Sequence, residues 1–238
     1  MQSFLLFTLE APLAALGDVA VGERRYGTGR PAKSAVLGLV AAALGIERTD
    51  ETTHHGLQDG LGYAVRIDQE GQPLEDFHTA QTPPSRRGKT WPTRRAELAA
   101  EGLETILSFR EYRTEVRYTV VLWPRTGGSW SLDELASALK RPRFILYLGR
   151  KACPLGCAPA PLVLQATSLT EAFAAYDDQT EGRLPGTRLH ADREAAPWLG
   201  PGWLQKRLSE RRDELTSRRR WQFRPRAELV AVLSLIHI

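Results

Sequence analysis

The chain is poor in cysteine, and it has no apolar segment close to the ~20 residues that a membrane-spanning helix needs. Its 238 residues include two cysteines, Cys153 and Cys157, which are too few for a disulfide framework, so we expect a reducing cytoplasm. The apolar run at residues 4–9 is too short for a signal peptide, and no basic residue precedes it. We therefore expect a cytoplasmic protein that does not contact a membrane.

Metal-binding and catalytic motifs are also missing. One cysteine pair falls short of the four ligands of a structural zinc site, and the adjacent His54 and His55 would point apart on a helix or a strand. The sequence contains no H-E-x-x-H, P-loop or G-x-S-x-G motif. We therefore expect no metal and no cofactor, and the motifs identify no catalytic residue.

The composition is that of an ordinary globular protein. It is 42% hydrophobic and 25% charged, and the length suits one large domain or two small ones. The net charge of +4 is a modest excess that fits a nucleic-acid partner but also fits proteins without one. The arrangement of the charges is therefore more informative than their sum.

Hydrophobic periodicity predicts an α+β fold. Strands are expected at residues 4–9, 62–68, 115–123, 143–148 and 163–166. Helices are expected at residues 33–44, 131–140 and 169–176, with a basic helix at 203–220. Residues 69–95 and 177–202 read as irregular, and residues 96–108 have weak helical character. The order strand, helix, strand, strand, helix, strand is that of a ferredoxin-like or RRM-like domain.

Local signals mark the ends of these elements. Pro12 is expected to end the first strand, and Gly45 is a natural cap for the first helix. Ser131 and Glu134 predict a capping box at the start of the helix at 131–140. Ser168 and Glu171 predict a cap at the start of the helix at 169–176.

A first basic cluster lies in the glycine-bearing loop at residues 17–32 and at the start of the helix after it. Its members are Arg24, Arg25, Arg30 and Lys33. A helix N-terminus carries free N–H groups and a positive dipole end, so it suits a phosphate, and glycines let an RNA backbone approach. The alternative is a solvated loop with ordinary surface arginines.

A second basic cluster contains no acid from Phe77 to Ala96, and Trp91 and His78 offer flat surfaces for bases. Its cations are Arg86, Arg87, Lys89, Arg94 and Arg95. Cations with stacking side chains are typical of single-stranded nucleic-acid binding. A mobile basic loop against an acidic protein neighbour is the alternative.

Two further basic features are weaker. Residues 206–226 hold nine Lys and Arg, which a solvated helix face would explain, although the run Arg218–Arg220 is harder to dismiss. The turn Tyr147-Leu-Gly149-Arg150-Lys151 places a glycine and two cations after a predicted strand, as in a phosphate clamp. A plain turn with exposed charges is the alternative.

Four stretches of the chain resemble the CasD family, the small RAMP subunit of the type I-E CRISPR Cascade complex. The similarity spans residues 1 to about 176, and residues 177–232 match poorly. The stretches are Ala11-Pro12 with Gly17, residues 28–46 (TGRPAKSAVLGLVAAALGI), Asp76–Thr79 with Arg110–Tyr112, and residues 141–155 (RPRFILYLGRKACPL).

The resemblance implies a modified ferredoxin-like (RAMP) domain at residues 1–150, with a protruding β-hairpin thumb at about 76–110. A smaller C-terminal region would occupy 151–232, and residues 233–238 read as a non-native tail. Family members hold the 5′ handle of the crRNA, contact the large and backbone subunits of Cascade, and meet target DNA indirectly through the complex. The expected RNA-binding residues are Arg24, Arg25, Arg30, Lys33, Ser34, His78, Arg86, Arg87, Lys89, Arg110, Tyr112, Tyr147, Gly149, Arg150 and Lys151.

Members of this branch do not cut the precursor RNA, so we expect no enzyme activity. One alternative is a crRNA-processing endoribonuclease, as in the type I-C branch. Metal-independent RNA cleavage needs a base and an acid near the 2′-hydroxyl, and His78, Tyr112 and Lys89 are the candidates. A structural bridge between protein subunits is a third possibility.

Overall fold

The computed structural model describes residues 1–17, 20, 22–84, 90–180 and 185–234. The elements in chain order are β1 (Gln2–Ala14), β2 (Arg24–Arg25), α1 (Lys33–Leu44), α2 (Glu51–Gly60), β3 (Leu61–Gln69), β4 (Gln72–Thr82), α3 (Arg94–Leu98), β5 (Glu104–Pro124), α4 (Leu132–Lys140), β6 (Leu162–Ala166), α5 (Leu169–Gln179), β7 (Arg188–Asp192), the 3-10 helix η1 (Arg193–Trp198), β8 (Trp203–Ser217) and β9 (Gln222–Leu233). No helix in these ranges is long and apolar enough to cross a membrane.

The strands within the described ranges form one large sheet in the order β6-β1-β5-β3-β7-β9-β8, with β2 and β4 paired to β5 beside this path. All the pairs are antiparallel except β2 with β5. The sheet therefore joins both regions of the predicted division, since β6 pairs with β1 and β7 with β3. The boundary at residue 150 stays a prediction.

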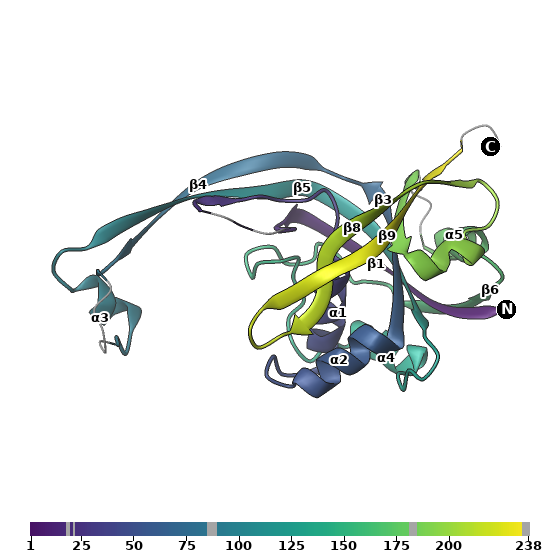
Figure 1. Ribbon diagram of the computed structural model, residues 1–238, viewed down its shortest axis with the longest axis horizontal. Helices are drawn as coiled ribbons and strands as arrows, with labels where there is room; N and C mark the ends of the chain where they lie inside the picture. Colours follow the sequence, from purple (N-terminus) through teal and green to yellow (C-terminus); the bar gives the residue numbers. More distant parts are fainter. Residues whose placement is uncertain (18–19, 21, 85–89, 181–184, 235–238) are drawn as a thin grey trace.

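Each face of the sheet carries its own apolar core. Because strand side chains alternate, Leu5 and Phe7 of β1 point to a core that includes α1, α2 and α4, while Phe4 and Leu6 point to one that includes α5 and η1. Figure 1 shows α1, α2 and α4 grouped together and α5 apart from them. Both faces are buried, which explains the continuous apolar run of β1.

A network of buried ion pairs joins β7, β8 and β9 to the start of α1. Arg226 of β9 donates from Nη1 to Asp192 of β7 at 2.7 Å and from Nε to Asp213 of β8 at 2.8 Å. The fully buried Lys33 donates from Nζ to Asp192 at 2.8 Å, and its backbone N–H donates to Asp213 Oδ2 at 2.9 Å. Two carboxylates thus fix the N-terminus of α1 against three strands.

Glu228 of β9 extends this network toward the loop before α1. It accepts hydrogen bonds from Arg30, from Arg226 at 3.3 Å and from His190 at 3.1 Å. Burial would raise the pKa of Glu228, but the His190 hydrogen bond and the Arg30 charge outweigh it and lower the pKa to about 2. Glu228 is therefore ionised although it is buried. Arg211 of β8 donates to the backbone oxygens of Pro31 at 3.2 Å and Arg30 at 3.2 Å, which fixes the same loop.

A long hairpin extends away from the rest of the molecule (Figure 1). It consists of β4 and the first half of β5, paired from Gln72↔Thr114 to Thr82↔Glu104, with α3 beyond the strand ends. Most of its residues are exposed or half-buried, and Ser108 is an exception. Its shape therefore depends on strand pairing and not on a core of its own.

The sequence predicted several elements correctly. The helix at 33–44 is α1, and Gly45 caps it in the left-handed conformation at φ 79°. The strands expected at 62–68 and 163–166 are β3 and β6, and the helix that begins after Ser168 is α5. The Ser168 side chain accepts from the backbone N–H of Glu171, as predicted.

The prediction for residues 203–220 was wrong. This segment is the strand β8, not a basic helix, and it pairs with β9 along its length. Arg211, Asp213 and Leu215 alternate as buried residues, which is a strand period. The pattern was hidden because two of the buried positions are charged.

Other element predictions also need correction. Residues 72–82 and 104–108 are hairpin strands, not irregular or helical; their exposed faces leave no apolar alternation to detect. Residues 143–148 were expected to form a strand and do not. Residues 188–192 and 193–198, which were expected to be irregular, form β7 and η1. The strand β1 continues past Pro12 to Ala14, since Pro12 is exposed and β6 pairs only with residues 2–6 of β1. Ser131 makes no side-chain cap hydrogen bond to α4.

Replacing Arg226 with Met should destabilise the fold by about 3–5 kcal/mol, because three buried carboxylates lose their shared cation. Urea unfolding monitored by tryptophan fluorescence measures the change. Arg224→Met, two residues away on the same strand and exposed, is the matched control and should cost less than about 1 kcal/mol. Equal losses in both variants would contradict the role assigned to the network.

Candidate nucleic-acid interface

The base of the hairpin presents polar and aromatic side chains on one face. Ser108, Arg110 and Tyr112 alternate along β5, so they share a face, and Arg110 Nε donates to Ser108 Oγ at 3.2 Å. Register places His78 opposite Ser108 and Arg25 opposite Arg110. Facing residues in paired strands point the same way, so these five side chains belong to one surface.

A glycine turn brings Arg150 onto this surface. Gly149 has φ 86°, and a Cβ at this position would lie 1.8 Å from the backbone oxygen of Ala15. The turn is fixed by hydrogen bonds from the Ala15 N–H to the Leu148 oxygen at 3.0 Å and from the Cys153 N–H to the Arg150 oxygen at 2.8 Å. Only glycine fits this close approach of two backbone segments.

The Arg150 guanidinium lies over the Tyr112 ring, 4.9 Å from its centroid, and Nη1 donates to the Tyr112 hydroxyl. A ring and a guanidinium held together in this way offer a stacking surface and a set of phosphate donors side by side. We call Arg25, His78, Arg110, Tyr112 and Arg150 the hairpin-base cluster. The structure therefore brings together residues from three of the segments singled out in the sequence.

Arg24 lies on the opposite face of the hairpin. Register pairs it with Phe109, its guanidinium lies 4.9 Å from that ring, and Nη1 forms an ion pair with Glu75 at 2.8 Å. Phe109 in turn contacts Phe77 at 5.2 Å between ring centroids. Arg24 is therefore separated from the hairpin-base cluster by the sheet.

The expected phosphate site at the start of α1 is already filled by the protein itself. Lys33 has no exposed surface, its Nζ and N–H both bind carboxylates, and burial lowers its pKa. Arg30 pairs with Glu228. The placement of Lys33 corrects its assignment as an RNA contact: the anion at this helix N-terminus comes from Asp213 and not from RNA.

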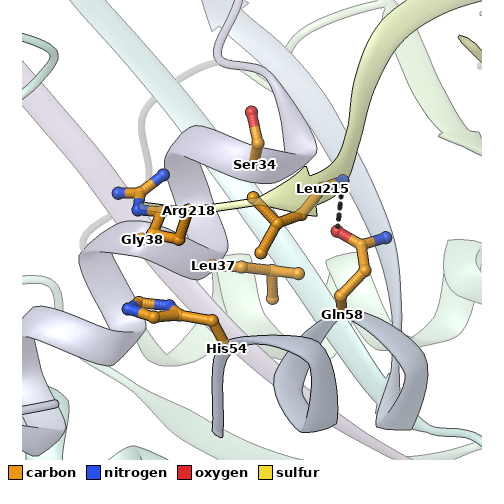
Figure 2. Close-up of a pocket in the computed structure, with 7 residues that line it drawn as sticks. All are labelled: Ser34, Leu37, Gly38, His54, Gln58, Leu215 and Arg218. Atoms are coloured by element: carbon orange, nitrogen blue, oxygen red, sulfur yellow. Dashed lines mark hydrogen bonds between the residues drawn. The ribbon is translucent and has the colours of Figure 1, made fainter. Parts of the chain in front are cut away.

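Ser34, the next residue of α1, faces a different part of the molecule. It lines a small pocket between α1, α2 and β8, together with Leu37, His54 and Arg218 (Figure 2). Nothing in the described contacts joins it to the hairpin-base cluster, so the structure does not bring Ser34 together with Arg150.

Of the other expected residues, two lie beside Arg150 and three lie outside the described part of the chain. Tyr147 is 37% exposed and Lys151 is exposed, next to Arg150 in the glycine turn. Arg86, Arg87 and Lys89 lie outside the described residues, between β4 and α3.

Some candidate residues were not anticipated from the sequence. Phe77 and Ile106 of the hairpin are more than half exposed, and so is Ile145, which lies beside the half-exposed Phe144 in the segment before the glycine turn. Large exposed apolar side chains are typical of interaction surfaces when they cluster. A correct strand assignment for β4 would have revealed Phe77, because its partner across the hairpin is also aromatic.

Two of the three residues proposed for an alternative nuclease, His78 and Tyr112, lie apart on the hairpin, and the third, Lys89, lies outside the described residues. Tyr112 of β5 pairs with Leu74 of β4, and His78 lies four positions further along β4 than Leu74. At about 3.3 Å per residue this separates the two positions by roughly 13 Å. A base and an acid acting on one 2′-hydroxyl need to reach the same few ångströms.

Comparisons with known proteins identify the family. Residues 4–228 match the family model of the CRISPR-associated protein (Cas5). The chain is 34% identical over 164 residues to the "CRISPR system Cascade subunit CasD" of Escherichia coli (strain K12), covering 65% of this chain and 68% of that protein. The chain belongs to the CRISPR-associated protein (Cas5) family, which confirms the resemblance found in the sequence motifs.

Solved structures share the fold. A chain from a "CRISPR RNA-guided surveillance complex" superposes with a TM-score of 0.63 at 20% identity, covering 97% of this chain and 90% of that one. A chain from a "Crystal structure of Cas protein" gives a TM-score of 0.63 at 24% identity, covering 97% and 95%. The mixed helix and sheet architecture with its large antiparallel sheet is therefore that of other Cas proteins.

Replacing Gly149 with Ala should destabilise the chain by about 2–4 kcal/mol, because the new Cβ collides with Ala15 and the backbone has positive φ. Gly102→Ala is the control: φ there is 71°, but nothing lies within 4 Å of the added Cβ, so it should cost only about 1 kcal/mol. Thermal unfolding of both variants measures the difference. Equal losses would show that the close approach of the two segments is not rigid.

Proposed function

We propose that this protein is a crRNA-binding subunit of a type I-E Cascade complex, that it holds the 5′ handle of the guide RNA, and that it does not cut RNA. The observation that carries this proposal is the contact between Arg150 and Tyr112 beside Arg110. The contact joins a cation from the glycine turn to an aromatic ring at the base of the hairpin.

The chemistry of the hairpin-base cluster suits a single RNA strand. Single-stranded RNA exposes both its phosphates and the faces of its bases, so proteins bind it with cations and with flat side chains. Arg25, Arg110 and Arg150 supply positive charge, while Tyr112 and His78 supply flat surfaces. Lys151 and Tyr147 continue the same chemistry along the turn, so a strand could follow the cluster for several nucleotides.

The topology supports a ferredoxin-like (RAMP) core. The strands β1, β3, β5 and β6 lie in the spatial order β6-β1-β5-β3, with α1 after β1 and α4 after β5. This is a βαββαβ unit in which β4 is an addition that lengthens the hairpin. On this assignment, the β4–β5 hairpin is the thumb and β7 to β9 form the C-terminal addition.

Partner subunits would cover the exposed apolar residues of the hairpin and of residues 144–145. Large apolar side chains exposed side by side, as Phe144 and Ile145 are, are typical of surfaces that contact partners. We assign these surfaces to the large subunit and the backbone subunits of the complex. Target DNA would then reach the protein through the assembly.

Replacing Arg150 and Lys151 together with Gln should weaken binding of a handle RNA about tenfold. The slope of the logarithm of the binding constant against the logarithm of the salt concentration should also become less steep by about 1.4, since two phosphate contacts to a single strand are lost. Fluorescence anisotropy with the handle of the cognate repeat, across a series of salt concentrations, measures both quantities.

Arg207→Gln with Arg212→Gln is the matched control for this experiment. It removes the same charge from exposed positions of β8, a strand that contributes no residue to the hairpin-base cluster. The control should bind the handle nearly as wild type does. An unchanged salt slope in the Arg150 and Lys151 variant would overturn the proposed contact.

Incubating the purified protein with repeat RNA and a chelator should give no specific cleavage, because His78 and Tyr112 are too far apart to act on one bond. Denaturing gel electrophoresis of end-labelled RNA detects any product. A specific cut that disappears in His78→Ala or Tyr112→Phe would replace the binding role with a processing endoribonuclease.

A further inference from the structure

The tip of the β8–β9 hairpin is an ordered turn of three arginines and a tryptophan. Glu51 of α2 fixes it: its carboxylate accepts from Ser217 Oγ at 2.7 Å and from the backbone N–H groups of Arg218 at 2.9 Å and Arg219 at 2.8 Å. These three hydrogen bonds lower the pKa of Glu51 to about 2. Trp221 closes the turn in the left-handed conformation, with φ 57°.

A fourth arginine, Arg48, joins the tip from the loop between α1 and α2. Arg48 Nε donates to the backbone oxygen of Arg218 at 3.3 Å. The guanidinium of Arg48 lies 4.7 Å from the centroid of the Trp221 ring, and that of Arg218 lies 4.5 Å from it. Two cations are thus held over one indole, and the indole is still 55% exposed.

The positive charge of this tip is compensated only in part, by the Glu51 carboxylate. Within the described ranges, Arg48, Arg218, Arg219 and Arg220 form no ion pair with a carboxylate. Glu51 is the nearby acid, and its oxygens are used by the turn itself. Burial and the charge of Arg48 lower the pKa of Arg218, which is the effect expected of a cation without a counter-charge.

Arg218 also has a fixed position against the body of the protein. Its guanidinium lies against Gly38 of α1, where an added Cβ would be 2.5 Å from Nη2, and Figure 2 shows it at the edge of the pocket formed with Ser34 and His54. A side chain held in this way loses little conformational freedom when it binds a ligand. Arg48 and Arg218 are therefore pre-organised cations, and the exposed Arg219 and Arg220 extend the same cationic surface.

We propose that Arg48, Arg218, Arg219 and Arg220 bind the phosphate backbone of duplex DNA. Arginine has a planar set of donors that matches phosphate oxygens, and all four cations of the tip are arginines. Two guanidiniums already lie over Trp221, so its ring is engaged by cations of the protein itself. This favours a duplex, whose bases are stacked inside and whose phosphates face outward.

A protein partner fits this surface less well. Apart from Trp221, the residues at the tip are cations, and protein interfaces are typically depleted of charge at their centre. The site uses none of the residues assigned to the RNA handle and concerns a different ligand, so the two proposals can fail separately.

The test uses the full chain and a fluorescein-labelled 30-base-pair duplex of arbitrary sequence. Arg219→Gln with Arg220→Gln should weaken binding about five- to tenfold and lower the steepness of the salt dependence by about 1.8, as expected for two lost phosphate contacts. The exposed Arg207→Gln with Arg212→Gln removes the same charge from the same hairpin and should change both quantities much less. Equal effects of the two double variants would overturn the proposal, because the duplex would then be bound only by non-specific electrostatic attraction to the net positive charge.

Three further measurements decide between ligands. The Arg150 and Lys151 variant should keep its affinity for the duplex, and circular dichroism should show that every variant folds. A 30-nucleotide single-stranded RNA should lose much less affinity than the duplex in the Arg219 and Arg220 variant. A polyglutamate peptide serves as the third ligand and represents an acidic protein. An equal loss of affinity for the single-stranded RNA, or a loss of affinity for the peptide alone, would overturn the assignment to duplex DNA.

Discussion

The fold depends on a small group of charges that water cannot reach. Asp192, Asp213 and Glu228 come from three neighbouring strands, and Arg226 binds all three. Lys33 connects two of these carboxylates, Asp192 and Asp213, to the first helix. Charges buried in this way are costly unless each one has a partner, so the strands, the loop before α1 and the helix have to assemble together. The rigid loop in turn lies along β5, where the Tyr118 hydroxyl donates to the Gly29 oxygen at 2.9 Å.

The same network explains what could be predicted from the sequence and what could not. The apolar segments that form β1, α1 and β3 have the periodicity of buried elements, and they were found. The strand β8 was missed because Arg211 and Asp213 occupy inward positions, where a sequence pattern is expected to be apolar. A local pattern cannot show that a charged residue has a buried partner far along the chain. An anion was also predicted at the N-terminus of α1, and one is there, but it is Asp213.

The candidate site was predictable in its parts and not in its arrangement. Tyr112 and Arg150 each belong to a motif of the family, yet they are 38 residues apart and no spacing rule joins them. Gly149 is what brings them together, because its missing side chain lets the turn pack directly against Ala15. The hairpin that carries Tyr112 was the least visible element, since a strand pair exposed on both faces has no hydrophobic pattern.

The hairpin has a mechanical consequence for the free protein. A two-stranded ribbon with solvent on both faces is marginal by itself, and here one end is anchored in the large sheet while the other leads to the short helix α3. Its amide hydrogens should exchange with solvent sooner than those of β1 or β3, and they should do so progressively from the far end toward the anchor. The distal half of the ribbon therefore takes its final curvature from whatever it lies against, so one chain can adapt to neighbours of slightly different shape.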